Sequence, residues 1–435
     1  MRKRRVKIKF ISILFGLLAA GIFIVLVTVI LDTKNALLDD GSSASRIKFK
    51  THGRNKGEIV AEVDSIYGDQ KGVYSLKNMV SSFTLSNGEL LTICADRVKA
   101  VRKDKMECEF LGNVKLSMES GLLIETRRLF ADFNKKTATG TDEVVIFQDD
   151  TRLSAKEYIF DMEKNTAILI NDAKGFLKAD KINADKLVIC FDDMYKKSIR
   201  SMEAIGNAVY IADTYTLKAK RSILYSMDKV EAQEKVVLFY KKDGNNYDIR
   251  SDFMHAKINN GKLDDIEAFG SLIIKTKDVA IRADRGILKG DKINVSSNVI
   301  ISGKHGNILG DVATLDLTTN DVFINKVNGQ EKVVLFYKKD GDNYDIRSDS
   351  MRAKINNGKL DDIEAFGSLV IKTKDATIRA DRGILKGDKI NVSSNVIISG
   401  KDGNILGDAA TLDLTTNDVF INKSSGVVNN GMRKS

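Results

Sequence analysis

Residues 270–302 read GSLIIKTKDVAIRADRGILKGDKINVSSNVIIS and decide the fold. Two β-rich segments, Gly270–Lys275 and Ser297–Ser302, lie on either side of turn-forming residues. In Ile281-Arg282-Ala283-Asp284, apolar or small residues alternate with charged ones, the period of two that is typical of a sheet with one wet face. The stretch therefore predicts strands joined by tight turns.

A tandem duplication contains this stretch. Residues 234–326 and 331–423 are the same sequence displaced by 97 positions, with a short linker at 327–330. The two copies differ at Asn245/Asp342, Phe253/Ser350, His255/Arg352, Ile273/Val370, Val279/Ala376, Ala280/Thr377, His305/Asp402 and Val312/Ala409. A closed globular core does not accept such an insertion, whereas a stack of layers takes another unit at constant cost. The architecture is therefore expected to be open-ended and modular.

Two weaker patterns recur through the rest of the chain. One is an apolar residue, any residue, a small residue and a charged one, as in Ile93-Cys94-Ala95-Asp96; the other is Gly112-Asn113 followed by alternating apolar residues. Turn signals recur about every 15 residues, which predicts roughly 27 strands in two facing sheets. Helical periodicity is absent after Leu31, and residues 50–233 and 234–423 share one plan.

The N-terminus predicts a membrane anchor. Residues 1–9 hold six basic and no acidic side chains, and Phe10–Leu31 is free of charge. A helix of that length, at ~1.5 Å per residue, spans a hydrocarbon core of roughly 30 Å. The flanking charges predict a cytoplasmic N-terminus and an exported body. Gly16 and Ala20 form a small-residue step on which another helix can pack.

Two alternatives remain at the chain ends. A cleaved signal peptide is the other interpretation of the apolar segment, although Thr28–Asp32 offers no small-x-small cleavage site. Residues 32–49 are expected to be a linker. The polar tail 424–435 is expected to be frayed, or else to fold back over the last strand and block assembly.

The remaining composition excludes several function classes. Six of the ten net positive charges lie in residues 1–9, so the body carries only +4 and does not show the basic face of a nucleic-acid binder. His255 and His305 become Arg352 and Asp402 in the duplicate, and no nucleophile-elbow, HExxH, CxxC or phosphate-loop motif occurs. No enzyme activity, metal or cofactor is therefore expected.

The three cysteines leave two possibilities open. Cys190 follows the apolar run Leu187-Val188-Ile189, which favours a buried thiol, while Cys94 and Cys108 are spaced so that they can pair across a hairpin. An exported body permits disulfides.

Taken together, these features resemble the periplasmic lipopolysaccharide-transport proteins of the LptC/LptA group, built from organic-solvent-tolerance-type repeats. Residues 1–200 resemble LptC, with a basic N-terminus, one anchor and the segments Phe110–Val114, Leu123–Leu129 and Leu153–Lys156. Residues 200–423 resemble the LptA-type repeat, with Ile266–Gly270 and Asn307–Asp311. The added repeat and the absence of proline depart from the usual pattern of the family.

The resemblance implies a fold and a function. The fold is an open, twisted antiparallel β-jellyroll of two facing sheets, with an LptC-like part at 50–233 and LptA-like repeats at 234–326 and 331–423. The function is transport, in which an apolar trough carries the acyl chains of lipopolysaccharide away from the inner membrane. The implied partners are lipopolysaccharide, an inner-membrane ABC transporter and other jellyroll proteins joined edge to edge.

The candidate binding residues are the inward-facing apolar side chains of the recurrent strands. They are Val114, Leu116, Ile124, Phe130, Val144, Ile146, Leu153, Ile159, Leu217, Leu272, Ile274, Ile281, Val299 and Ile301. Alternation assigns these residues to one face of a sheet, and the same pattern fits a closed core. An anchored β-solenoid that serves as a structural or adhesive spacer is therefore the alternative function. A polysaccharide-processing enzyme is a third, which requires an acidic cleft that the pattern does not show.

Overall fold

The computed structural model describes residues 43–422, apart from gaps at 53–57, 69–72, 85–89, 102–106, 192–198 and 326–331 and at one or two positions in several turns. The expected all-β body is confirmed: the described residues form 31 strands and no helix. The expected anchor at 10–31 and the tail at 424–435 lie outside the described residues. Within the described part, no helix has the length and hydropathy needed to cross a membrane.

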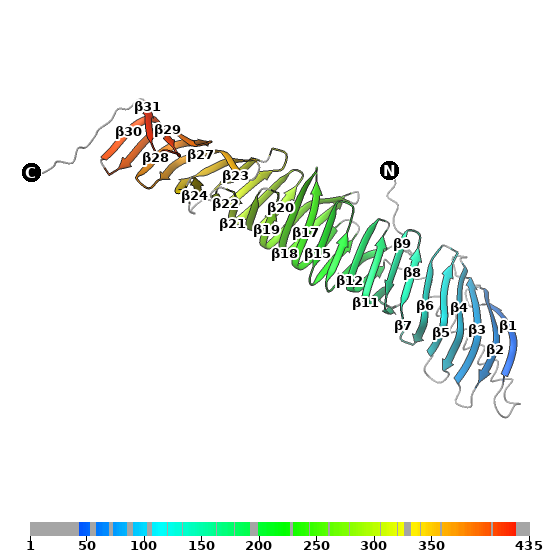
Figure 1. The fold of residues 1–435 in the computed structure, drawn as a ribbon. Helices are drawn as coiled ribbons and strands as arrows, with labels where there is room; N and C mark the ends of the chain where they lie inside the picture. Colours follow the sequence, from blue (N-terminus) through cyan, green and yellow to red (C-terminus); the bar gives the residue numbers. More distant parts are fainter. Residues whose placement is uncertain are drawn as a thin grey trace, which may run out of the picture. The chain divides into compact units, whose positions relative to one another are not determined.

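Every strand pairing between the described residues is antiparallel, and Figure 1 labels the strands in chain order. The first sixteen are β1 (Ser43–His52), β2 (Glu58–Gly68), β3 (Val73–Thr84), β4 (Leu90–Val101), β5 (Glu107–Met118), β6 (Leu123–Asp132), β7 (Thr137–Gly140), β8 (Val144–Gln148), β9 (Thr151–Ala155), β10 (Glu157–Asp161), β11 (Thr166–Leu177), β12 (Asp180–Phe191), β13 (Ile199–Ile205), β14 (Ala208–Ile211), β15 (Tyr215–Ala219) and β16 (Ser222–Ser226).

The remaining strands contain the two repeats. They are β17 (Lys229–Lys242), β18 (Asn245–Asn259), β19 (Lys262–Lys275), β20 (Ala280–Lys289), β21 (Lys292–Gly303), β22 (Gly306–Asp316), β23 (Asp321–Asn325), β24 (Val333–Lys339), β25 (Asp342–Ser348), β26 (Ser350–Asn356), β27 (Lys359–Lys372), β28 (Ala376–Lys386), β29 (Lys389–Gly400), β30 (Gly403–Asp413) and β31 (Val419–Asn422).

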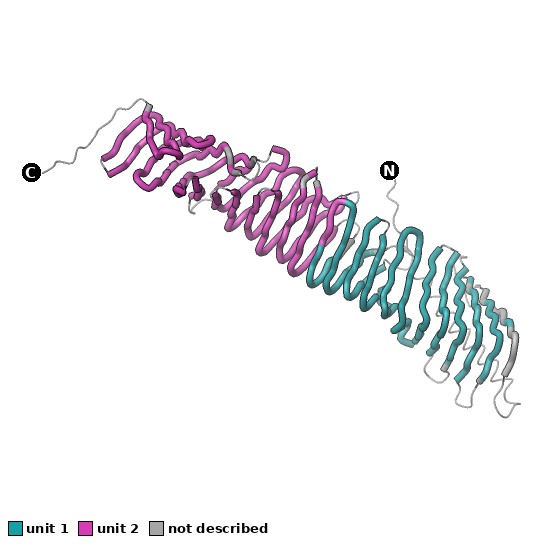
Figure 2. Tube along the Cα trace, in the orientation of Figure 1, with its two compact units in different colours: residues 1–213, 218–227 teal, residues 214–217, 228–435 magenta. Residues whose placement is uncertain are grey.

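The chain divides into two compact units, coloured separately in Figure 2. The first comprises residues 1–213 and 218–227, and the second comprises residues 214–217 and 228–435. The boundary expected at 233 lies a few residues inside β17, because that strand begins at Lys229. The second unit holds both copies of the duplication.

In each unit the long strands pass through two layers of one hydrogen-bonded sheet, and each short strand belongs to one layer; the layers are called the two sheets below. In unit 1, the first half of β11 pairs with β10, and its second half, Lys174–Leu177, pairs with β9. In unit 2, the first half of β27, Lys359–Phe366, pairs with β26, and Val370–Lys372 in its second half pairs with β25. A long strand therefore turns a corner at its middle and passes from one sheet to the other.

The corner is built by residues in the left-handed conformation. Gly206 and Asn207 have φ values of +76° and +46°, and the neighbouring strand presents Asp185, whose carboxylate accepts a hydrogen bond of 3.0 Å from Asn207 Nδ2. The same amide-to-carboxylate bond recurs at Asn78–Asp64, Asn113–Asp96, Asn171–Glu157, Asn298–Asp284 and Asn395–Asp381. Asn113 belongs to the Gly-Asn sequence pattern and Asp96 to the Ala-Asp pattern. The two weak patterns therefore supply the two hydrogen-bonded residues of one corner, on adjacent strands.

Alanine at a corner glycine is expected to destabilise unit 1. A Cβ on Gly206 would lie 2.4 Å from Asp185 Oδ2, in a conformation that L side chains rarely adopt, so Gly206→Ala combines backbone strain with loss of the Asn207–Asp185 bond. We expect a loss of about 2–3 kcal/mol in the free energy of unfolding.

Gly121→Ala is the matched control for this prediction. Gly121 has a φ of +86°, yet a Cβ there meets nothing within 4 Å, so only backbone strain of about 1–2 kcal/mol is expected. Urea denaturation followed by circular dichroism compares the two variants. Equal losses would show that the corner contact contributes nothing.

The two sheets face each other across an apolar interior. In β8 and β12 buried and half-buried side chains alternate, which puts one side of each strand inside. In unit 2 the hydroxyl of Tyr344, on β25, lies 2.9 Å from the carbonyl oxygen of Leu414, just after β30. No pairing among the described strands joins β25 to the segment after β30, so this contact links parts of the fold that the strand ladder does not connect.

Candidate functional site

Twelve of the fourteen candidate lining residues lie in the interior. Each is at most 3% exposed: Val114, Leu116, Ile124, Val144, Ile146 and Leu153 in unit 1, and Leu217, Leu272, Ile274, Ile281, Val299 and Ile301 in unit 2. Their neighbours inside are mainly aliphatic, with few aromatic rings. The structure thus gathers these residues into the apolar interior of the two units.

Phe130 and Ile159 do not face the interior, which corrects their assignment. Phe130 is 36% exposed and Ile159 is half-buried, while the adjacent Leu129 and Tyr158 are buried. In β6, Arg127 and Arg128 are both exposed at the corner, and this extra outward residue reverses the alternation beyond it. Counting by twos from Ile124 therefore gives the wrong face for Phe130, and the corner before β10 does the same for Ile159.

The interior is closed in this structure. Ile124, Val144 and Ile301 are 0% exposed, and similar values hold along the strands of both units. The expected open trough is not seen among the described residues. The apolar surface is present, but the two sheets pack against each other over it.

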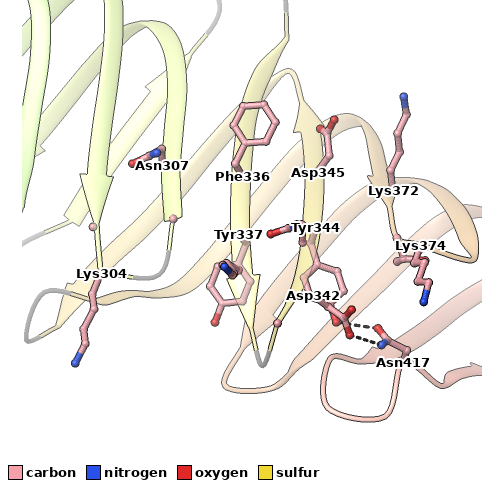
Figure 3. A pocket seen from close by; sticks show the side chains of 16 residues that line it. Lys304, Asn307, Phe336, Tyr337, Asp342, Tyr344, Asp345, Lys372, Lys374 and Asn417 are labelled. Carbon is pink, nitrogen blue, oxygen red and sulfur yellow. Dashed lines mark hydrogen bonds between the residues drawn. The ribbon is translucent and has the colours of Figure 1, made fainter.

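Polar contacts hold the sheets together at the margin opposite the corner, where the hairpin turns lie. In unit 2, Tyr344 Oη lies 2.8 Å from Asn417 Oδ1, and Asn417 Nδ2 donates a 2.8 Å hydrogen bond to Asp342 Oδ2, as Figure 3 shows. Lys339 forms an ion pair with Asp388. These contacts join the β24–β25 turn to turns of the facing sheet.

The duplication provides the same strand edge twice. Residues 306–325 and 403–422 differ only at Val312/Ala409. In the first copy, β22 pairs with β24 and β23 pairs with β26. In the second copy, β30 and β31 pair with β29 and with each other, and no further strand among the described residues covers them.

Side chains on the second edge are more exposed than their equivalents on the first, because only the first edge is covered by further strands. Ile308 on β22 is 0% exposed, whereas the equivalent Ile405 on β30 is half-buried. Phe323 and the equivalent Phe420 are 43% and 59% exposed. The end of unit 2 therefore presents an edge whose nearly identical counterpart in the first copy is covered by β24 and β26.

The possible Cys94–Cys108 pair is absent, since all three cysteines are free thiols. On paired strands β4 and β5, Cys94 lies opposite Lys115 and Cys108 lies opposite Ala100, so the two cysteines are six positions apart. Cys108 is buried, and this burial raises the pKa of its thiol to about 12, which keeps it neutral at physiological pH. Cys190 is half-buried.

No group of three or more His, Cys, Asp or Glu side chains that would hold a metal occurs in the part of the chain that the structure describes. No protein-family model and no curated protein sequence matches the chain. The candidate site is therefore defined by its own geometry: an apolar interior, a polar margin and an uncovered strand edge.

Proposed function

We propose that the chain is a non-catalytic, inner-membrane-anchored carrier that holds the acyl chains of lipopolysaccharide between its two sheets and passes them on in the periplasm. The observation that carries the proposal is the apolar interior of each unit, with twelve predicted lining residues at most 3% exposed. Each CH₂ of an acyl chain moved from water to such a lining gains ~0.8 kcal/mol. Several chains therefore bind tightly without any catalytic group.

The closed interior is compatible with this function. An empty apolar furrow in water closes, because each Å² of exposed apolar surface costs about 25 cal/mol. The side-chain hydrogen bonds at the corner, such as Asn207–Asp185, join adjacent strands and not the two facing sheets, so the corner acts as a hinge when the polar contacts at the opposite margin separate. Acyl chains then replace the contacts between the facing sheets.

The uncovered edge supports assembly with other proteins. An unpaired strand offers backbone donors and acceptors to another chain. In this protein, β30 and β31 repeat the sequence of β22 and β23, which already bind an incoming pair of strands. We propose that another jellyroll protein occupies this edge, and that the anchored end faces an inner-membrane ABC transporter.

The alternative is an anchored β-solenoid that serves as a structural or adhesive spacer, and the closed interior favours it. The two functions differ in one respect: a spacer keeps its sheets together, whereas a carrier must admit lipid. The decisive comparison is therefore between inward and outward positions of the same strand.

Photo-crosslinking in cells tests the proposal. A photoreactive amino acid at Leu272 or Ile281, which are each 1% exposed, is expected to label lipopolysaccharide, and one at the exposed Arg282 is expected to label little. Arg282 is adjacent to Ile281 on β20, so it controls for expression and location. Equal labelling at Ile281 and Arg282, or none at the inward positions, would remove the carrier function and leave the spacer.

A further inference from the structure

A cavity lies at the seam between the two repeats, on the hairpin margin of unit 2. It measures about 810 Å³ and is bounded by the β21–β22 turn of the first repeat, the β24–β25 and β27–β28 turns of the second, and Asn417. None of the fourteen candidate lipid-lining residues lines it. Figure 3 shows side chains from these turns around the cavity.

The cavity exists because one hairpin is longer than its neighbours. Tyr337 pairs with Gly306 on one side, and Asp345 pairs with Lys372 on the other. The segment between Tyr337 and Asp345 therefore projects beyond both neighbouring turns. The duplication thus creates a recess that combines residues of the two copies.

The recess carries unneutralised positive charge. Lys304, Lys338, Lys372 and Lys374 line it, all four are exposed, and none forms an ion pair within the described residues. Its two carboxylates are already engaged, since Asp345 pairs with Arg347 at 2.8 Å and Asp342 accepts the bond from Asn417. The cavity is thus suited to an anion.

The other lining groups suit a sugar ring. Phe336 is 48% exposed, and the Tyr337 and Tyr344 rings lie 6.5 Å apart between centroids. Asn307 and Asn343 present exposed amides that can both donate and accept hydrogen bonds from hydroxyl groups. An exposed aromatic ring beside amides and ammonium groups matches the apolar face, the hydroxyls and the charge of a phosphorylated saccharide.

We infer that this seam cavity binds a phosphorylated saccharide. The inference extends the proposed carrier function by naming the polar half of its ligand, and it rests on that function only for the lipid-linked source of the saccharide. A free sugar phosphate has the same chemistry.

The test is calorimetric titration of the full-length chain in detergent. The probes are a phosphorylated glucosamine disaccharide without acyl chains, the same disaccharide without phosphate, and inorganic phosphate. We expect the phosphorylated disaccharide to bind at least tenfold more tightly than either other probe, and this affinity to fall with added salt. Equal binding of the unphosphorylated disaccharide, or of inorganic phosphate, would overturn the inference.

The duplication supplies a matched control. Lys304→Gln, Lys338→Gln, Lys372→Gln and Lys374→Gln, combined, are expected to weaken binding at least tenfold. The same four changes at the duplicate positions, Lys401→Gln, Lys241→Gln, Lys275→Gln and Lys277→Gln, alter the net charge equally and are expected to change affinity less than twofold. Equal weakening by both sets would show attraction to net charge alone and would contradict a site at the seam.

The outcome is independent of the interior, because the probe has no acyl chains. Repeating the titration with the intact glycolipid identifies the source: tighter binding of the glycolipid than of the free disaccharide supports a lipid headgroup. Failure of the titration with successful labelling at Ile281 removes only the seam site, whereas the converse result removes only the carrier function.

Discussion

Phe110→Ala is expected to lower the free energy of unfolding by about 3–5 kcal/mol, the cost of removing a large ring from a packed core. Phe110, on β5, is 0% exposed and ranks among the largest fully buried side chains. Its ring lies within the apolar interior of unit 1, so the loss combines transfer free energy with the cavity left behind. Urea denaturation followed by circular dichroism measures the change.

Phe130→Ala is the control on the neighbouring strand β6. Phe130 is 36% exposed and faces away from the interior, so we expect a loss of less than about 1 kcal/mol. Similar losses for both variants would contradict the assignment of faces on either side of the corner.

Ile308→Lys is expected to disrupt the junction between the repeats, whereas Ile405→Lys is expected to be tolerated. Ile308 is 0% exposed on β22, which is paired with β24. An ammonium group there is buried without a partner, so the free energy of unfolding falls by about 3 kcal/mol or more. Ile405 is the same residue in the second copy, half-buried on an uncovered strand, and the cost there is expected to be below about 1 kcal/mol.

Hydrogen–deuterium exchange of β22 and β24 provides the local measurement for this pair. The Ile308 variant is expected to lose protection in both strands, and the Ile405 variant to keep it. If both variants lose protection equally, the second copy is covered like the first, and the edge proposed for assembly is not available.

Much of the fold could be predicted from the sequence because it depends on local signals. Alternation in Ile281–Asp284 and the glycine and asparagine turns indicate strands, and the 97-residue duplication indicates a stack that accepts another layer. The estimate of roughly 27 strands is close to the 31 that the described residues form, since most turns carry a recognisable signal.

The corners limited the prediction of the site. Two consecutive outward-facing residues, Arg127–Arg128 in β6 and Lys156–Glu157 at the start of β10, shift the alternation, so Phe130 and Ile159 were assigned to the wrong face although their strands were correctly placed. The repeated Gly-Asn and Ala-Asp patterns mark the positions of the corners in the sequence. Their partnership becomes visible only when adjacent strands are brought together, as in the bond from Asn113 to Asp96.

The contacts across the margin could not be read from the sequence at all. Tyr344 and Leu414 are 70 residues apart, and their approach depends on the way in which the two sheets face each other. The seam cavity likewise results from the relative lengths of three hairpins. Neither feature has a local pattern.

A distance measurement across the margin tests the carrier function most directly. Lys339 and Asp388 form an ion pair between facing turns, and spin labels at these two positions report the separation of the sheets. The distance is measured by double electron–electron resonance in a chain whose Cys94 and Cys190 are replaced by serine. Addition of lipopolysaccharide is expected to lengthen this distance, and addition of its deacylated form is expected to leave it unchanged. An unchanged distance with lipopolysaccharide bound would contradict opening of the interior and would favour a rigid spacer.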